Sequence, residues 1–339
     1  MRGLLPPNPE MQTIAVIWLM VFLGGYIAIY LLADLIIDAL ENLSQSFAIS
    51  PIVLGLLVLG IDVEESIVSL VAAVDGLPYL SLGQLIGNTV IAIAIAFGVP
   101  ALFLRIEVDQ LPRFYYAELV IAGIVVLVSM VLTSYLIVFG LLAIALFVIH
   151  LRHTFHIQRE FRSAVRSPER FELTPNLERE KCTGEKSEGR ARFVIKLLLA
   201  LLAVFVSGEV LVVSAEELVV LTGLSETFFG LVIMAAVTNV EEFWLIVKAV
   251  QKGQTALGVS AQVGKIIWNT TLIFGLCSLF LFQFTFEMIM LTSSIIFVFA
   301  LVVLVVNLTQ NRSSRATGIG YLLILLIFLA INSLGFLIG

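Results

Sequence analysis

Apolar residues dominate the chain in long runs, and short polar stretches separate one run from the next. About 20 apolar residues in an α-helix are enough to cross the roughly 30 Å of hydrocarbon in a bilayer. The pattern predicts an all-α polytopic membrane protein with ten spans. The expected spans are 11–46, 50–75, 81–104, 114–133, 135–151, 192–222, 226–251, 255–282, 285–306 and 316–337. The first and sixth are longer than a perpendicular span needs, which fits tilted helices.

Composition agrees with this pattern and excludes a soluble domain. The 339 residues are 60% apolar and 13% charged, with a mean hydropathy of +1.09. Soluble domains are about half apolar and about a quarter charged. Cys182 and Cys277 lie in a polar and an apolar segment, so no disulfide is expected. No phosphate-binding or dinucleotide motif occurs, which argues against a primary pump and a bound cofactor, and nothing supports nucleic-acid binding.

The distribution of Lys and Arg predicts the orientation in the membrane. Ten of the nineteen lie within 152–192. If this segment is cytoplasmic and the spans alternate, the opposite side keeps only Arg2, as the positive-inside rule requires. The other cytoplasmic-side positions are Arg105, Arg113, Lys248, Lys252, Arg312 and Arg315. We therefore expect a multi-pass cell-membrane protein with extracytoplasmic termini and a polar, solvated cytoplasmic linker.

The sequence contains an internal repeat. Residues 30–58 align with 205–233 at an offset of 175, and residues 63–103 align with 240–280 at an offset of 177. Matched positions are Asp34 with Glu209, Glu41 with Glu216, Gly55 with Gly230, Glu64-Glu65 with Glu241-Glu242, Asp75-Gly76 with Lys252-Gly253, and Gly87 with Gly264. Five spans per copy is an odd number, so the second copy must be inverted in the membrane, which is a transporter architecture.

This repeat sets the expected domain organisation. A first five-helix repeat covers 1–151, the cytoplasmic linker covers 152–191, and a second five-helix repeat covers 192–339. In such proteins the substrate site lies near the midplane, where the two halves meet.

Two pairs of adjacent glutamates lie inside apolar spans, Glu64-Glu65 in the second and Glu241-Glu242 in the seventh. Ionised carboxylates at this depth are costly and are by default functional. Asp62 and Asn239 precede the pairs and compete with the helix for backbone hydrogen bonds, so a break is expected there. Freed carbonyls and carboxylates together suit a hard cation. Adjacent helical residues point about 100° apart, so only one glutamate of each pair is expected to meet the centre.

The third and eighth spans supply polar groups that face the glutamates. Asn88 lies in the third, and Lys265 and Asn269 lie four residues apart on one face of the eighth. Lys265 is about ten residues into its span, too deep to reach water easily, so we expect it to pair with a carboxylate.

At these residues the chain resembles the sodium/calcium exchanger superfamily of cation/calcium antiporters, which has ten spans and two inverted repeats. Its repeats carry a Gly-Thr-Ser-Leu-Pro-Glu-like motif followed by a Gly-Ser-Asn-x-x-Asn/Asp-like motif. The first motif aligns Gly60, Ile61, Asp62 and Glu65 in one half and Thr238, Asn239 and Glu242 in the other; the second aligns Asn88 in one half and Gly264, Lys265 and Asn269 in the other.

The chain departs from the family pattern at several positions. Glu64 and Glu241 replace the motif proline, Lys265 replaces a serine, and Ala92 replaces an asparagine. Family sodium sites use those serine and asparagine oxygens, so the resemblance supports the central divalent site better than the sodium sites. The ligand set it implies is Glu65, Glu242, Asp62, Thr238, Asn239, Asn269, Asn88 and Ile61, with Lys265, Glu64 and Glu241 as charge-compensating neighbours.

The leading functional hypothesis is a secondary antiporter that exchanges a divalent cation, with Ca²⁺ as the first candidate, for Na⁺ or H⁺ by alternating access. The alternatives are an uncoupled cation channel and a non-transporting membrane ion sensor. An enzyme is disfavoured, because no nucleophile–base motif is present and the three His residues are placed at the cytoplasmic edge. The expected partners are inorganic cations and the lipid bilayer; the oligomeric state stays open, and a monomer is compatible with the sequence.

Overall fold

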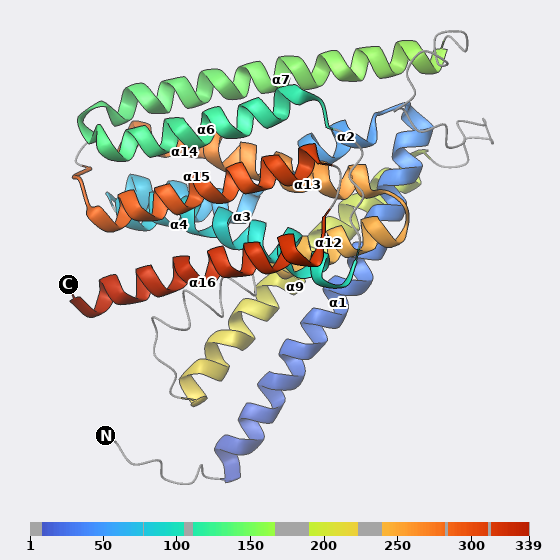
Figure 1. Cartoon of the computed structure of the whole chain (residues 1–339). Coiled ribbons are helices and arrows are strands. Elements are labelled where there is room, and N and C mark those ends of the chain that lie inside the picture. The colour runs from blue at the N-terminus through green and yellow to red at the C-terminus, as the bar shows by residue number, and fades with distance from the viewer. Residues whose placement is uncertain are drawn as a thin grey trace.

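A computed structural model describes residues 9–76, 78–104, 111–166, 190–222, 239–281, 284–310 and 313–338. All regular secondary structure in these ranges is helical (Figure 1). The first half contains α1 (Pro9–Phe47), α2 (Pro51–Leu54), the π-helix η1 (Gly55–Leu59), α3 (Val63–Val74), α4 (Pro78–Ala92), the π-helix η2 (Ile93–Gly98), α5 (Val99–Phe103), α6 (Arg113–Val131), the 3₁₀ turn η3 (Thr133–Tyr135) and α7 (Leu136–Arg166). The second half contains α9 (Arg190–Thr222), α12 (Val240–Gln251), α13 (Thr255–Ile267), the π-helix η5 (Trp268–Ile273), α14 (Phe274–Phe280), α15 (Met288–Thr309) and α16 (Arg315–Ile338).

By length and composition, seven helices within the described ranges can cross a membrane. They span Thr13–Ser44, Ser81–Phe103, Arg113–Val131, Thr133–Ser163, Thr255–Phe280, Met288–Thr309 and Arg315–Asn332. Each coincides with one of the expected spans. The second expected span is interrupted in the structure, and much of the seventh, residues 226–238, lies outside the described residues. The all-helical membrane fold is confirmed.

The internal repeat is visible in the helix boundaries. α3 begins at Val63 and α12 begins at Val240, which are matched positions at the offset of 177, and both helices contain 12 residues. The turns that follow also match, because Gly76 and Gly253 both adopt a positive φ, of 71° and 72°. A residue with a Cβ is strained in that conformation, so glycine at both positions keeps the two turns alike.

The second expected span is broken where the sequence predicted it. The π-helix η1 ends before Gly60, and α3 begins at Val63 with Asp62 as its N-cap. The Asp62 side chain accepts a hydrogen bond from the Glu65 backbone N–H at 3.2 Å, which satisfies one of the free donors at a helix start. The break therefore places two acidic residues at a helix N-terminus inside the bundle.

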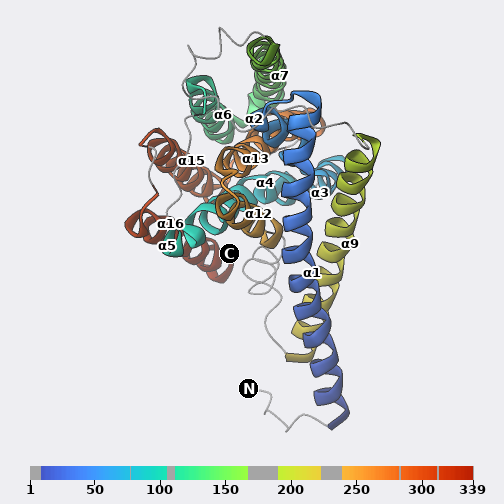
Figure 2. The same cartoon turned by 90° about the vertical axis from the view of Figure 1, so that its right-hand side faces the viewer.

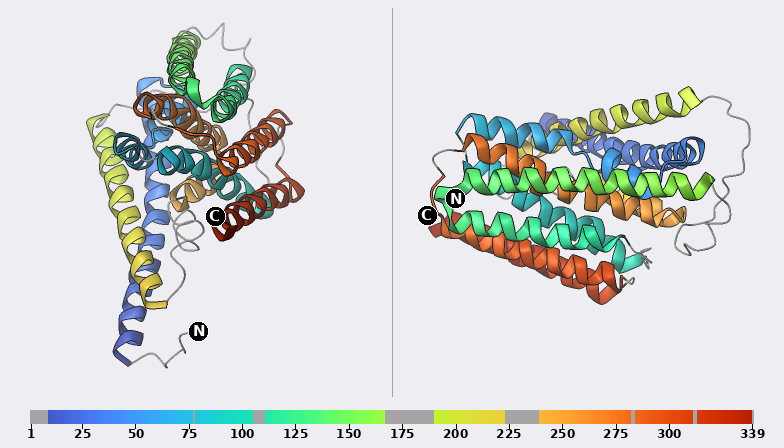
Figure 3. Two further views of the ribbon diagram at one scale, coloured as in Figure 1. Left: turned by 90° about the vertical axis from the view of Figure 1, so that its left-hand side faces the viewer. Right: turned by 90° about the horizontal axis from the view of Figure 1, so that it is seen from above.

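The helix that contains the fifth span is longer than the expected span 135–151, because α7 continues to Arg166. The first part of this extension still packs on the bundle, because Ile157 contacts the main core and Thr154 is buried. Figure 3 (right) shows α7 and α16 ending at opposite ends of the bundle.

The helices form two groups. α1 and α9 pack side by side and run obliquely across the remaining helices, which are bundled together (Figures 1 and 2). The left view of Figure 3 shows this pair standing to one side of the bundle. An apolar cluster joins the pair to the bundle, because Ile36 and Leu40 of α1 and Leu197 and Ala200 of α9 pack with Leu257 of α13. The larger core joins α4, α6, α13 and α15 around Leu82, Leu119, Val263 and Phe297.

The two halves touch most closely where η1 crosses α13. A Cβ on Gly264 would lie 2.7 Å from the backbone oxygen of Leu56, and a Cβ on Gly60 would lie 2.8 Å from the Gly264 Cα. Only glycine permits this backbone approach, as at other close helix crossings in membranes. The crossing brings the break in the first half beside Lys265 in the second.

Candidate functional site

The site lies where four helices meet, two from each half. Asp62 and Glu65 stand at the start of α3, and Glu242 stands in the first turn of α12. Lys265 comes from α13, and Asn88 comes from α4. Helix N-termini carry partial positive charge, so carboxylates in the first turns of α3 and α12 are favourably placed.

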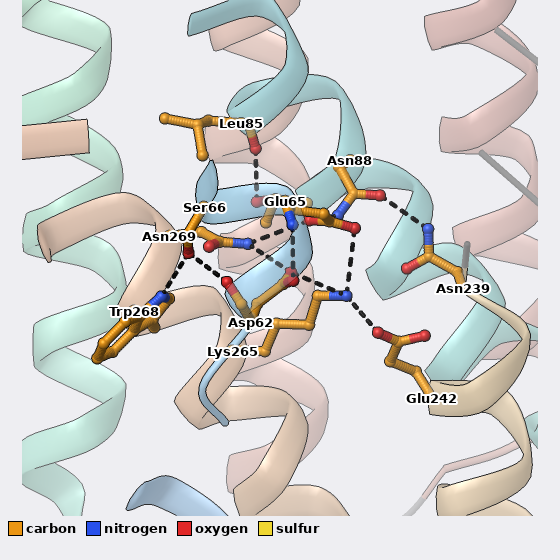
Figure 4. Close-up of polar contacts among 11 residues, drawn as sticks. Asp62, Glu65, Ser66, Leu85, Asn88, Asn239, Glu242, Lys265, Trp268 and Asn269 are labelled. Atoms are coloured by element: carbon orange, nitrogen blue, oxygen red, sulfur yellow. Dashed lines mark hydrogen bonds and ion pairs between the residues drawn. The ribbon is translucent and has the colours of Figure 1, made fainter. Parts of the chain in front are cut away.

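Lys265 is surrounded by three carboxylates (Figure 4). Its Nζ lies 3.2 Å from Asp62 Oδ2 and 3.4 Å from Glu65 Oε1, and it donates a hydrogen bond to Glu242 Oε1. The Lys265 side chain is 7% exposed, and the three acidic side chains are between 4% and 9% exposed. The prediction that this lysine pairs with a central carboxylate is confirmed, and the pairing joins the two halves.

A chain of amides leads from the second half into the first. Asn239, the N-cap residue of α12, donates its Nδ2 hydrogen to Asn88 Oδ1 at 2.8 Å, and Asn88 Nδ2 donates to Glu65 Oε2. Asn269 Nδ2 lies 3.3 Å from Asp62 Oδ2 and 3.4 Å from Glu65 Oε2. Glu65 thus receives donors from both halves, which holds its carboxylate at the centre.

Two oxygens of the cluster are left without a hydrogen-bond partner. Among the described residues, Glu242 Oε2 and Asn269 Oδ1 are buried acceptors in this state. A buried oxygen without a donor costs free energy, so such atoms suit a cation that supplies the missing interaction. The donor set of carboxylates and amide oxygens is the kind that hard cations such as Ca²⁺ prefer.

The carboxylates converge on the ammonium of Lys265 rather than on one common point. Within the described part of the chain, no group of three or more His, Cys, Asp and Glu side chains is placed to hold a metal ion directly. A divalent ion at the centre therefore requires Nζ to move away from Glu65 and Glu242.

Two residues that the sequence analysis gave no role support the site from outside. Trp268 donates its indole N–H to Ser66 Oγ at 2.8 Å, and Ser66 donates to the backbone oxygen of Asp62. The Trp268 ring packs edge-on against Phe147 of α7, with ring centroids 5.6 Å apart. An indole N–H in an apolar span needs an acceptor, and this was the available signal for a structural role of Trp268.

The remaining expected ligands do not all reach the cluster. Ile61 lies in the break, but its apolar side chain is 41% exposed. Thr238 and the Glu64 side chain lie outside the described residues. Glu241 lies beside Glu242 with a partly buried side chain. Of each glutamate pair, Glu65 and Glu242 meet the centre, as the helical geometry required for one member of each.

A second buried polar cluster lies between α6 and α7. His150 Nδ1 lies 2.8 Å from Glu118 Oε2, both side chains are almost inaccessible, and Thr154 bonds to Tyr115 at 2.9 Å beside them. The sequence analysis placed His150 at the cytoplasmic edge; in the structure α7 continues 16 residues past it, and its ring is buried against Glu118. Glu118 received no role, although a lone carboxylate in an apolar span indicates a buried partner.

Comparison with known proteins gives a consistent result. The family model described as "Sodium/calcium exchanger protein" matches residues 17–155 and 193–334, one block in each half. The Escherichia coli (strain K12) "Inner membrane protein YrbG" is 27% identical over 266 residues, which are 75% of this chain and 77% of the relative.

Solved structures of the sodium-calcium exchanger NCX_Mj share the fold. One, soaked with Na⁺ and Sr²⁺, has a TM-score of 0.71 at 19% identity and covers 93% of this chain and 99% of that one. Another Na⁺ and Sr²⁺ soak has a TM-score of 0.72 at 20% identity and covers 93% and 98%. Because the family model covers most of both halves, the chain belongs to the sodium/calcium exchanger protein family.

Proposed function

We propose that the chain is a secondary antiporter that exchanges a divalent cation, Ca²⁺, for Na⁺ or H⁺ by alternating access. Membership in the family implies cation antiport. The observation that carries the divalent assignment is that Glu65 and Glu242, from matched positions of the two halves, meet at the buried centre on either side of the Lys265 ammonium. Two carboxylates balance one divalent ion.

Alternating access is supported by the arrangement of the helices. The site is enclosed by α3, α4, α12 and α13, whereas α1 and α9 pack on each other outside it. A pair that packs as a unit can slide across the bundle and open the site to one side at a time. The cytoplasmic placement of the segment 152–191 and the extracytoplasmic placement of both termini belong to this proposal.

Lys265 occupies the place of one monovalent cation in this mechanism. Its ammonium lies within ion-pair distance of all three central carboxylates, at a position where the family motif has a serine. A tethered positive charge cannot leave with the cargo. The antiporter therefore moves fewer coupling ions per divalent ion than a relative that binds free ions at the same place.

Flux measurements on the purified full chain in liposomes test this function. Under an imposed Na⁺ or pH gradient, the parent is expected to accumulate Ca²⁺ against its own gradient. Glu65→Gln and Glu242→Gln are each expected to reduce this uptake to background, because one of the two divalent-balancing charges is lost. Glu118→Gln is the matched control, since it removes a buried carboxylate that lies outside the site.

Each outcome separates the candidate functions. Downhill Ca²⁺ movement that ignores both gradients identifies an uncoupled channel. Saturable Ca²⁺ binding without any flux identifies an ion sensor. Full coupled uptake by both glutamine variants, with size-exclusion profiles like the parent's, overturns the assignment of the site.

A further inference from the structure

The central charges are not symmetric between the two halves, although the halves are repeats. At the offset of 177, Glu65 matches Glu242, so this pair is common to both halves. Asp62 matches the neutral Asn239, and Lys265 matches the neutral Asn88. The first half has thus one additional negative charge, and the second half has one additional positive charge.

These two additional charges contact each other. Asp62 Oδ2 and Lys265 Nζ are 3.2 Å apart, and both side chains are buried, at 9% and 7% exposure. Their matched neutral counterparts also come together, because Asn239 donates to Asn88 at 2.8 Å. The repeat therefore places an ion pair at one position and a neutral amide pair at its symmetry mate. Neither pair adds net charge to the centre.

We propose that Asp62 and Lys265 form a self-neutralising pair that leaves the centre with the charge of Glu65 and Glu242 alone, so that one divalent cation exchanges for two monovalent cations without net charge movement. This inference rests on the proposed antiport function. The four side chains sum to −2: three carboxylates and one ammonium. A buried charge without compensation costs several kcal/mol, so both loaded states must carry the same cargo charge of +2.

The geometry gives Lys265 a place to remain when the cargo arrives. A divalent ion between Glu65 and Glu242 displaces Nζ from both, and Asp62 keeps the ammonium paired. Asn269 Nδ2, 3.3 Å from Asp62 Oδ2, further fixes this carboxylate. Asp62 thus acts as the counter-ion of the lysine and Glu65 as the ligand of the cargo, although the two residues lie in the same helical turn.

The test is the potential dependence of coupled exchange in liposomes. Purified full-length protein is reconstituted, Ca²⁺ is the divalent probe, and Na⁺ and H⁺ gradients are imposed in separate arms to identify the monovalent ion. A K⁺ gradient with valinomycin sets the membrane potential. One net charge per cycle would shift the final Ca²⁺ accumulation ratio about tenfold for each tenfold K⁺ gradient. The parent is expected to show no shift.

Variants separate the pair from the site. Lys265→Asn leaves the centre at −3, and its exchange is expected to depend on the potential. Asp62→Asn together with Lys265→Asn returns the centre to −2 with the symmetric residues. However fast it transports, the double variant is expected to exchange Ca²⁺ without the dependence on membrane potential that Lys265→Asn shows. Ca²⁺/Ca²⁺ exchange, which needs no coupling ion, verifies that each variant is folded and carries the divalent ion.

The outcomes distinguish this inference from the proposed function. A tenfold shift in the parent overturns charge-balanced exchange while antiport itself stands. Equal potential dependence in the single and double variants overturns the self-neutralising pair. If the parent shows neither coupled uptake nor Ca²⁺/Ca²⁺ exchange, the proposed function fails and this inference fails with it.

Discussion

Two lysines of this protein are each held by acidic side chains, in very different surroundings. Lys265 lies at the contact between the halves among carboxylates that are 4–9% exposed. Lys252 follows α12 and contacts Asp34 and Asp38 of α1, whose side chains are 42% and 53% exposed. Water can replace a partner at the second site but not at the first. Lys265 therefore depends on its carboxylate partners for compensation of its charge, whereas Lys252 can exchange a carboxylate partner for water.

Lys248, Lys252, Asp34 and Asp38 form an edge cluster that holds α1 against α12. Lys252 Nζ lies 3.0 Å from Asp34 Oδ1 and 2.5 Å from Asp38 Oδ1. Lys248 adds an ion pair to Asp34 at 3.6 Å and stands 3.7 Å from the centre of the Tyr30 ring. These contacts join the α1–α9 pair to the bundle at one end of the molecule.

The repeat cannot form the same cluster at the related position. Asp34 matches Glu209 and Lys252 matches Asp75, so both matched residues are acidic. Opposite charges therefore attach α1 to the bundle, whereas the matched positions offer like charges. The two halves differ in these charges, although their central glutamates match.

The largest effect is expected from removing the central ammonium. Lys265→Met leaves three buried carboxylates without their cation, and breaking a buried pair from one side costs about 3–5 kcal/mol. The loss is measured by thermal unfolding in detergent, followed by tryptophan fluorescence. Added Ca²⁺ is expected to restore stability more in this variant than in the parent, because it binds the folded state alone. A variant as stable as the parent without added ions would show that the carboxylates do not depend on Lys265.

A smaller effect is expected at the glycine crossing that supports the centre. Gly264→Ala places a methyl group 2.7 Å from the Leu56 backbone oxygen, and such overpacking costs about 1–3 kcal/mol. Gly87→Ala is the matched control, because Gly87 is the repeat counterpart and its added Cβ would meet only Phe328 at 3.5 Å. The unfolding temperature in detergent is expected to be lower for Gly264→Ala than for Gly87→Ala. The reverse order would show that α13 and η1 can move apart without a loss of stability.

Much of the centre was predictable because membrane burial makes polar residues rare and costly. Asp62 in an apolar run indicated the break, and the depth of Lys265 required a carboxylate partner. The matched glutamates indicated that both halves contribute. These conclusions depend on depth along a helix, which sequence spacing gives directly.

Features that depend on how helices rotate against one another were not predictable. The contact of Trp268 with Ser66 joins η5 to α3, and the pair of His150 with Glu118 joins α7 to α6. Spacing along one helix does not say which face meets a neighbour. Similarly, the sequence placed Asp62 among the cargo ligands, and only the 3.2 Å contact identifies it as a partner of Lys265.

The smallest effect is expected at the edge cluster. Lys252→Ala removes two ion pairs to partly exposed carboxylates, and exposed pairs contribute about 0.2–1 kcal/mol. Burial alone would lower the pKa of Lys252. The hydrogen bonds to Asp38 and Asp34 raise it by more than burial lowers it, so the pKa lies above its ordinary value. A raised pKa means that the stabilisation is present at neutral pH and is lost only as pH rises through the folded-state value. Near neutral pH, the contribution of this cluster to stability therefore responds to salt concentration rather than to pH.

The difference in unfolding temperature between Lys252→Ala and the parent is expected to shrink from low salt to about 1 M salt, where screening acts within a few ångströms. Lys265→Met, measured in the same salt series, should keep its deficit, since its partners are buried. If both deficits respond equally to salt, the two clusters do not differ in their access to water.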